Sequence, residues 1–579
     1  MAIRARNIKK AARLCVLMGA LAGCTPVVPT AAPPAETAPS AATAAPGGPV
    51  VMRRLTAQQY RQIIEDAFGA SIALGGRFEP DRREAGLVAV GAGRASITAS
   101  GFEQYDKMAR AIAAQVVDAR HRAQLISCRP ADAAKPDDAC ATKFLAAAGR
   151  LLYRRPLTQA ELQAHVNGAG AAATRLGDFY RGLGIALGGL LASPDFLFIH
   201  EFTEADPRRS AGQRLDAYSK ASRLSFFLWN TMPDDELLAA AARGELHNDK
   251  GLARQVDRLL ASPRLESGVR AFFTDMLGFD TFATLAKDAT LYPKFTFKVA
   301  EAAQEQTLRT LVDHLLMDKG DYRDIFTTRK TFLTPLLASV YRVRMASPNG
   351  LTDTWSPYRF ADDEPQAGIL TQASFVALHS HPGRSSPTLR GKALRETLLC
   401  QKVPDPPANV NFNIVQDTAN PNFKTVRQRL LAHSTEAMCA GCHKITDPMG
   451  LALENFDAIG GYRRLENGAV IDSTGELDGV RFGDAVGLGK AMHDNTAAPA
   501  CLIKRAYTYA VGREATPAES TWLNADVTRQ FAADGYRLPL LLRRIAVNET
   551  FYRVAGPSAD ASAQRASAAP NDRQPEAGQ

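Results

Sequence analysis

The sequence lacks the features that mark several common protein classes. It has no Gly-rich phosphate loop and no G-x-S-x-G motif, so neither a P-loop protein nor a serine hydrolase of the α/β type is indicated. No apolar stretch is long enough to span a bilayer. Five of the 69 basic residues lie in the first thirteen positions and account for more than half of the net charge of +9. The remaining charge is nearly balanced, so a nucleic-acid partner is not expected.

The N-terminus has the pattern of an export signal. A basic stretch precedes an apolar run at residues 14–23, which is too short to cross a bilayer as a stable helix. The run ends in Leu21-Ala22-Gly23-Cys24, which resembles a bacterial lipobox and implies that Cys24 is lipidated and becomes the first mature residue. An uncleaved anchor and an ordinary signal peptide are the alternatives. Because Thr25 is not aspartate, the resemblance implies a cell-envelope lipoprotein at the outer membrane.

Six cysteines lie beyond this segment, and export determines how they are interpreted, because free thiols tend to pair in oxidising compartments. Cys128 and Cys140 enclose a short loop rich in Pro, Asp and Ala, for which we predict a local disulfide. Cys400 and Cys501 are then candidates for a long-range disulfide. The remaining pair, Cys439 and Cys442, belongs to a motif that carries chemistry.

The segment Cys439-Ala440-Gly441-Cys442-His443 matches C-x-x-C-H, the attachment signature of c-type haem. The two thiols add to the porphyrin vinyl groups, and the histidine ligates the iron. A structural zinc site would need four ligands, and no second C-x-x-C or H-x-x-x-H follows downstream. A redox C-x-x-C needs no histidine and usually accompanies a βαβ unit, for which the sequence has no pattern. We therefore predict one covalent haem c.

The second axial ligand is left open among three residues. Met492 ranks first because it lies at a comfortable distance along the chain, followed by Met449 and then His493. A methionine ligand would favour electron transfer, whereas an open position would favour small-molecule chemistry. Flanking helices are predicted at residues 425–438 and 500–512, and we expect them to pack around the haem.

Four further residues are weaker candidates for contact with the haem. Arg390 and Arg463 could pair with the propionates, although salt bridges between protein groups are the favoured interpretation. His379 and His381 could act as distal acid–base groups, although hydrogen-bonded loop histidines are favoured.

The start signals along the chain are nearly all helical, including capping boxes at Thr56, Thr158 and Thr516, and residues 232–236 open another helix. A small β-hairpin insert is predicted near residues 468–484. The fold class is therefore mainly α, a multidomain helical body with a C-terminal cytochrome c-like haem domain. The predicted boundaries are 1–24 for the signal peptide, 25–50 for a Pro/Ala-rich tether, 51–145 for an N-terminal helical domain, 146–205 for a small helical domain, 206–345 for a central helical domain, 346–402 for a connecting segment, 403–495 for the haem-binding domain, 496–556 for a C-terminal helical domain and 557–579 for a disordered tail.

Over roughly residues 52–535 the sequence resembles the large multidomain cytochrome c proteins of planctomycetes and myxobacteria, which are built from a series of domains of unknown function. The segments that carry the resemblance are 53–60, 153–158, 223–229, 232–237, 368–374, 386–392, 399–400, 439–443, 447–448, 453–460 and 509–513. The resemblance implies the haem and the architecture but no substrate. One departure is Met449, where the family has an apolar leucine, and this weakens Met449 as a family ligand.

Three functions follow from these observations. The first is a cell-envelope redox protein that relays single electrons to an unidentified redox partner and is attached to the membrane through its lipid anchor. The second is a haem enzyme with an open distal site, so the sequence leaves open whether the protein is an enzyme. The third is a non-enzymatic surface protein that binds a polymer or a partner.

Overall fold

The helices begin where the sequence places their capping residues. Thr56, Thr158 and Thr516 each form a complete capping box, in which the threonine side chain accepts from the third backbone N–H of the helix and the Gln or Glu at that position accepts in return. Asp234 caps the helix predicted after residue 232. These predictions are confirmed. The sequence could indicate the caps because a cap depends only on neighbouring residues.

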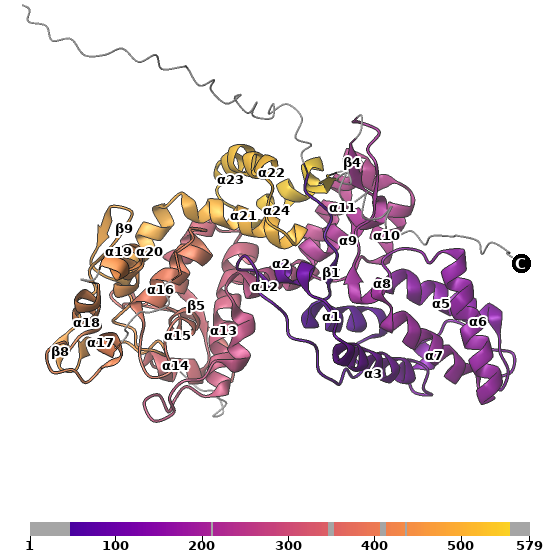
Figure 1. Ribbon diagram of the computed structural model, residues 1–579, viewed down its shortest axis with the longest axis horizontal. Helices are drawn as coiled ribbons and strands as arrows, with labels where there is room; N and C mark the ends of the chain where they lie inside the picture. Colours follow the sequence, from indigo (N-terminus) through magenta and orange to yellow (C-terminus); the bar gives the residue numbers. More distant parts are fainter. Residues whose placement is uncertain (1–46, 210–211, 346–352, 406–412, 435–436, 556–579) are drawn as a thin grey trace, which may run out of the picture. The chain divides into compact units, whose positions relative to one another are not determined.

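The computed structural model describes residues 47–209, 212–345, 353–405, 413–434 and 437–555 (Figure 1). The predicted signal peptide with Cys24, nearly all of the tether and the tail at 557–579 lie outside the described residues. Among the described residues, no helix combines the length and the hydropathy needed to cross a membrane.

Most of the N-terminal helices share one hydrophobic core, which includes Tyr60, Leu145 and Leu187, whereas Ala89 and Val90 belong to the larger core described below. In this part of the chain α7 packs against both α6 and α3 (Figure 1). The elements are β1 (Arg53–Arg54), α1 (Ala57–Phe68), α2 (Val88–Gly91), α3 (Ala99–Val116), α4 (Arg122–Leu125), α5 (Asp138–Leu152), α6 (Gln159–Leu176), α7 (Phe179–Ala192), α8 (Pro194–Leu197) and β2 (Phe198–Ile199).

A second and larger core joins the central and C-terminal helices. The central elements are β3 (Thr203–Ala205), β4 (Gln213–Leu215), α9 (Ala217–Leu228), α10 (Asp235–Ala242), α11 (Asp249–Ala261), α12 (Arg264–Met276), α13 (Phe297–Val312), β5 (Lys330–Leu333), α14 (Pro335–Tyr341), β6 (Ser356–Arg359), α15 (Ala373–Leu378) and α16 (Pro387–Ala393). The C-terminal elements are α17 (Asn413–Gln416), α18 (Val426–His433), α19 (Ala437–Leu451), β7 (Leu465–Glu466), β8 (Ala469–Val470), β9 (Gly475–Leu477), β10 (Val480–Phe482), α20 (Ala485–Asp494), α21 (Ala497–Val511), α22 (Pro517–Trp522), α23 (Thr528–Ala533), α24 (Leu538–Val547) and β11 (Arg553–Val554).

The strands are short and form antiparallel sheets of two or three strands. Two of these sheets join distant parts of the chain, since β1 pairs with β2 and β11 pairs with β4. The predicted hairpin insert is present, but it consists of two hairpins, β7–β8 and β9–β10. The mainly α fold is thus confirmed, with small sheets that fasten the helices to one another.

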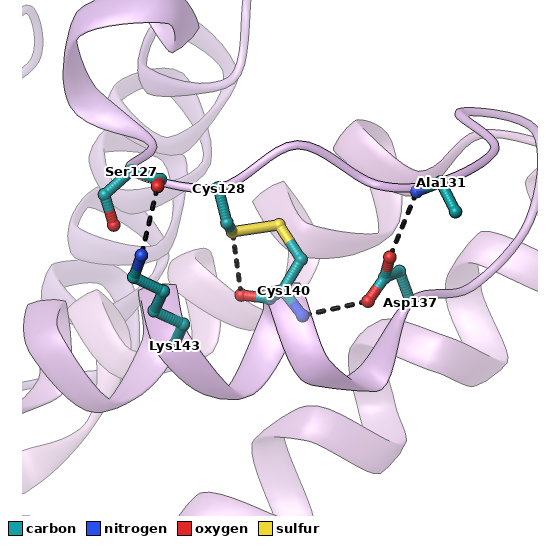
Figure 2. The surroundings of a disulfide bond; sticks show 6 residues. All are labelled: Ser127, Cys128, Ala131, Asp137, Cys140 and Lys143. Carbon is teal, nitrogen blue, oxygen red and sulfur yellow. Dashed lines mark hydrogen bonds between the residues drawn. A yellow bond between two sulfur atoms is a disulfide. The ribbon is translucent and has the colours of Figure 1, made fainter.

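Both predicted disulfides are present. Cys128 and Cys140 lie 5.5 Å apart between Cα atoms, and Cys400 and Cys501 lie 5.2 Å apart. Figure 2 shows the first bond at the start of α5, where Asp137 accepts from the backbone N–H of Cys140 at 2.9 Å and of Ala131 at 3.1 Å. One side chain therefore caps the helix and closes the loop that the disulfide crosses.

The two helices predicted around the haem motif differ in outcome. The helix predicted at 425–438 is wrong in its extent, because α18 ends at His433 and a new helix, α19, contains the motif. The helix predicted at 500–512 corresponds to α21, which ends at Gly512 in the left-handed conformation. Its neighbours include α2, α9, α12 and α24, so α21 is part of the central core.

Candidate haem-binding site

The motif lies on α19, whose position is set by close backbone contact with α16. A Cβ added to Gly391 would lie 1.9 Å from the Thr446 carbonyl oxygen, and one added to Gly450 would lie 1.8 Å from that of Pro387. Only glycine permits this approach. The two helices are therefore locked together immediately beyond the motif.

The two motif cysteines are the free ones among the described cysteines. Cys439 is buried and Cys442 is partly exposed, whereas the other four described cysteines are paired in disulfides. Cys442 Sγ lies 3.7 Å from the Pro404 carbonyl oxygen, at the start of the Pro-rich segment. The two thiols are thus separated by less than one helical turn and are not bonded to each other.

The third motif residue, His443, is held through one ring nitrogen. Its Nδ1 lies 2.7 Å from Oδ2 of Asp447, one helical turn further along α19. The other oxygen of Asp447 accepts hydrogen bonds from the hydroxyls of Thr388 (2.8 Å) and Thr446 (3.2 Å). An imidazole that donates from Nδ1 keeps the lone pair of Nε2 for a metal. Asp447 is thus placed to orient His443 as an axial ligand, a role that sequence analysis missed.

A solvent-open cavity of about 860 Å³ lies beside His443. Its apolar wall comes from Leu430, Leu431, Leu451 and Phe482. Its rim carries Arg427, Lys444 and Arg481, of which Arg427 pairs with Asp472 and Arg481 with Glu476. Apolar side chains suit the faces of a porphyrin, and basic ones suit its propionates. Two free thiols and one oriented imidazole are the donor types that haem c requires, and of these three residues His443 is the one that lines the cavity.

His433 is a second histidine close to the motif. It is buried at the end of α18, and the centroid of its ring lies 5.1 Å from that of His443 in an edge-on arrangement. In the sequence, the only indication that His433 lies close to His443 is its position at the end of the helix that precedes the motif.

The candidates for the second axial ligand lie elsewhere. Met449 and Met492 are both 0% exposed within the large hydrophobic core, and neither is among the described residues that line the cavity. His493 forms ion pairs with Asp494 and Asp324 when protonated.

The weaker candidates have partners within the protein. Arg390 is completely buried, donates to the carbonyl oxygens of Leu453 and Phe456, and pairs with Glu454. Arg463 pairs with the same carboxylate at 3.0 Å. Both arginines thus follow the favoured interpretation of salt bridges between protein groups.

The two loop histidines near this cluster are also poor acid–base candidates. Burial lowers the pKa of His379 to about 3, and the positive charges of Arg390 and Lys287 act in the same direction. The pKa of His381 is lowered as well, first by burial and then by Arg384. Both histidines are therefore neutral at physiological pH.

Comparison with protein families shows which domain architecture the chain has. Five family models match in succession, each described as a protein of unknown function: DUF1587 at 53–118, DUF1595 at 140–201, DUF1592 at 215–343, DUF1588 at 366–466 and DUF1585 at 478–551. This series is the planctomycete-type multidomain cytochrome c architecture. In this architecture the motif at 439–443 falls within the DUF1588 match. The association of these domains with cytochrome c points to a redox-related role.

No curated protein and no solved structure matches the chain.

Proposed function

We propose that the protein is a cell-envelope c-type haem lipoprotein that relays single electrons between unidentified partners. The observation that carries the proposal is the state of α19, where two unpaired thiols and an oriented imidazole lie within two turns of one helix. The rejection of a zinc site stays a prediction from the sequence, in which no second pair of ligands accompanies the motif.

The chain would hold the cofactor through three residues. Cys439 and Cys442 would each form one thioether bond, and Nε2 of His443 would bind the iron. When bound, haem c supplies a one-electron iron couple. Asp447 accepts from Nδ1 of His443 and so favours the tautomer with a free Nε2, and the apolar residues of the cavity would contact the porphyrin. After export, Cys24 would carry the lipid that holds the helical part of the protein at the membrane surface.

A haem enzyme with an open distal position is the second candidate. It is favoured by the burial of Met449 and Met492 in the core, away from the cavity wall. Their assignment as axial ligands is kept as a proposal, together with that of His493. A low-spin spectrum with a Met–iron charge-transfer band would support the relay, and a high-spin spectrum would support the enzyme.

The decisive experiment expresses the full chain together with cytochrome maturation machinery. We expect intact-mass analysis to show one added haem and the visible spectrum to show a c-type signal. The variant C439A/C442A should lose both, whereas the control C128A/C140A, which alters the other sequence-local cysteine pair, should keep them. Motif thiols that are found bare, or bridged to each other, would refute the haem proposal.

A further inference from the structure

A second cavity lies among helices α1, α2, α9, α12 and α21 and shares no lining residue with the cavity beside His443 (Figure 1). Its volume is about 270 Å³, slightly below the usual range for drug-sized ligands. Most of its wall is apolar and includes Val88, Ile199, Phe226 and Ala271. Such a cavity suits a small organic molecule, whose polar part must then meet one of the few polar groups of the wall.

The charged side chains of this wall balance one another, because it holds three arginines and three aspartates. Arg54 pairs with Asp81 at 3.2 Å, and Asp275 and Asp280 both pair with Arg83. An ion that entered the cavity would lose its hydration and meet no net opposite charge. The cavity therefore favours an uncharged ligand.

Asn230 is a buried polar residue of this wall, and two neighbours fix its side chain. It is 5% exposed and follows the end of α9 in the left-handed conformation, with φ +56°, which asparagine adopts more readily than most residues. Its Oδ1 accepts from Nε2 of Gln59 at 2.9 Å and from the hydroxyl of Tyr509 at 3.1 Å. These two donors hold the side-chain amide in one orientation.

Hydrogen bonding also determines which atom of this amide is the nitrogen. Oε1 of Gln59 accepts from the backbone N–H of Thr56 in the capping box of α1, so Nε2 of Gln59 is the donor. The Asn230 atom that Nε2 meets is therefore the oxygen, and Nδ2 lies on the other arm of the amide. Nδ2 has no acceptor among the described residues, and it is not one of the polar atoms that the fold seals from water. An N–H2 group is thus available to a molecule in the cavity.

Two further features of the wall are compatible with a ligand. The hydroxyl of Thr274 forms no hydrogen bond within the part of the chain that the structure describes, so it is a second polar group with capacity for a partner. On the outer side, Gln58 and Arg61 are exposed and line the cavity, so a small molecule can enter from solvent.

The lone pairs of a carbonyl oxygen complement the planar N–H2 group of an amide. We propose that this cavity binds a small uncharged carbonyl compound, whose oxygen accepts from Nδ2 of Asn230 and whose apolar body lies against Ile199 and Phe226. The site shares no residue with the haem motif. It would therefore give the helical body a ligand of its own, whether or not the protein carries a haem.

Calorimetry on the purified full chain tests this, with benzamide and acetophenone as uncharged carbonyl probes and sodium benzoate as a charged probe with the same ring. We expect saturable binding of at least one uncharged probe, a matching rise in Tm, and no saturable binding of benzoate. The variant N230D keeps an oxygen for Gln59 and Tyr509 but replaces the N–H2 group with a second oxygen. Its affinity for the better probe should fall about tenfold or more. The control N248D makes the same change at the exposed cap of α11, outside the cavity, and should bind normally.

Several outcomes would overturn the proposal. Absence of saturable binding for both uncharged probes would do so, as would benzoate binding as tightly as the better uncharged probe. Unchanged affinity in N230D would show that Asn230 does not contact the ligand, and equal losses in N230D and N248D would indicate a general charge effect. If N230D does not fold, T274L provides the test, because it keeps Asn230 but fills part of the cavity. Unchanged affinity in T274L would exclude this site.

Discussion

The helices α19 and α21 are both 15 residues long and both carry cysteine, but they lie in opposite environments. In α21 nearly every residue from Ala498 onward is buried or half-buried, and Cys501 is bonded to Cys400. In α19 both cysteines are free and His443 faces a large cavity. Val426 and Leu430 of α18 form a small buried cluster with Leu451 of α19, while Met449 on the other side of α19 belongs to the large core. Cys501 is therefore bonded within the core, whereas the two motif cysteines are unbonded on a helix that borders a cavity.

This difference has a physical cause. A helix that is buried all round gains stability from each apolar contact, whereas a helix beside a cofactor site must leave space and polar groups available. Substitutions around α21 should therefore change mainly the free energy of unfolding. Substitutions around α19 should change mainly the properties of the bound haem. Substitutions in the two regions test whether α19 and α21 differ in this way.

The largest expected effect is that of the disulfide on α21. C400A/C501A opens a loop of 101 residues, which should lower the free energy of unfolding by about 4.7 kcal/mol in the chain-entropy model. The control C128A/C140A opens a loop of only 12 residues and should cost about 3 kcal/mol. Denaturant unfolding of the two variants measures the difference. Equal losses would mean that α21 is not anchored more firmly than the N-terminal helices.

The second effect concerns Glu519, which accepts from both terminal nitrogens of Arg513 just beyond α21. Burial acts to raise the pKa of Glu519, but the hydrogen bonds and charge of Arg513 outweigh it and lower the pKa to about 2. The charged folded form therefore gains about 3 kcal/mol relative to the unfolded chain.

Because the folded pKa is depressed, this stabilisation is complete above the unfolded value of 4.5 and is lost as the pH falls toward 2. E519Q should be less stable at pH 7, and its stability should change less between pH 5 and pH 2, as followed by urea unfolding at each pH. Parallel pH profiles for the two proteins would contradict this role.

The third effect is that of Asp447 on α19. D447N should cost only about 1–2 kcal/mol in stability, because an amide can still accept from one hydroxyl. In the haem-loaded protein it should raise the reduction potential, since His443 loses an anionic partner. D472N removes the same charge from the edge of the same region and is the matched control. An equal shift in potential for both variants would indicate a general charge effect.

The smallest effect is that of the two buried methionines. M449L and M492L conserve volume in the core and should each change stability by less than about 1.5 kcal/mol. If the distal position of the haem is open, the visible spectrum should be unchanged in both variants, because neither side chain lines the cavity. Loss of a Met–iron band in one variant would instead identify that residue as the axial ligand.

The features predicted successfully are those that depend on neighbouring residues or on chemistry. The capping boxes at Thr56, Thr158 and Thr516 are local. With the motif cysteines set aside, four cysteines allow three pairings, and the short loop between Cys128 and Cys140 favoured the pairing that is observed. The break between α18 and α19 was not predicted, because the apolar pattern runs on through residues that the fold separates. Asp447 was missed because its partners include Thr388, a residue of another helix.

The sequence by itself determined the mainly helical class, the helix starts, the two disulfide pairs and the motif that marks the haem hypothesis, since these depend on short spacings and residue chemistry. Only the tertiary structure decided that Thr388 of another helix fixes Asp447 beside His443, and that Met449 and Met492 are buried in the core. Burial and pairing across helices arise from contacts between segments that are distant in the chain, and no local sequence pattern records such contacts.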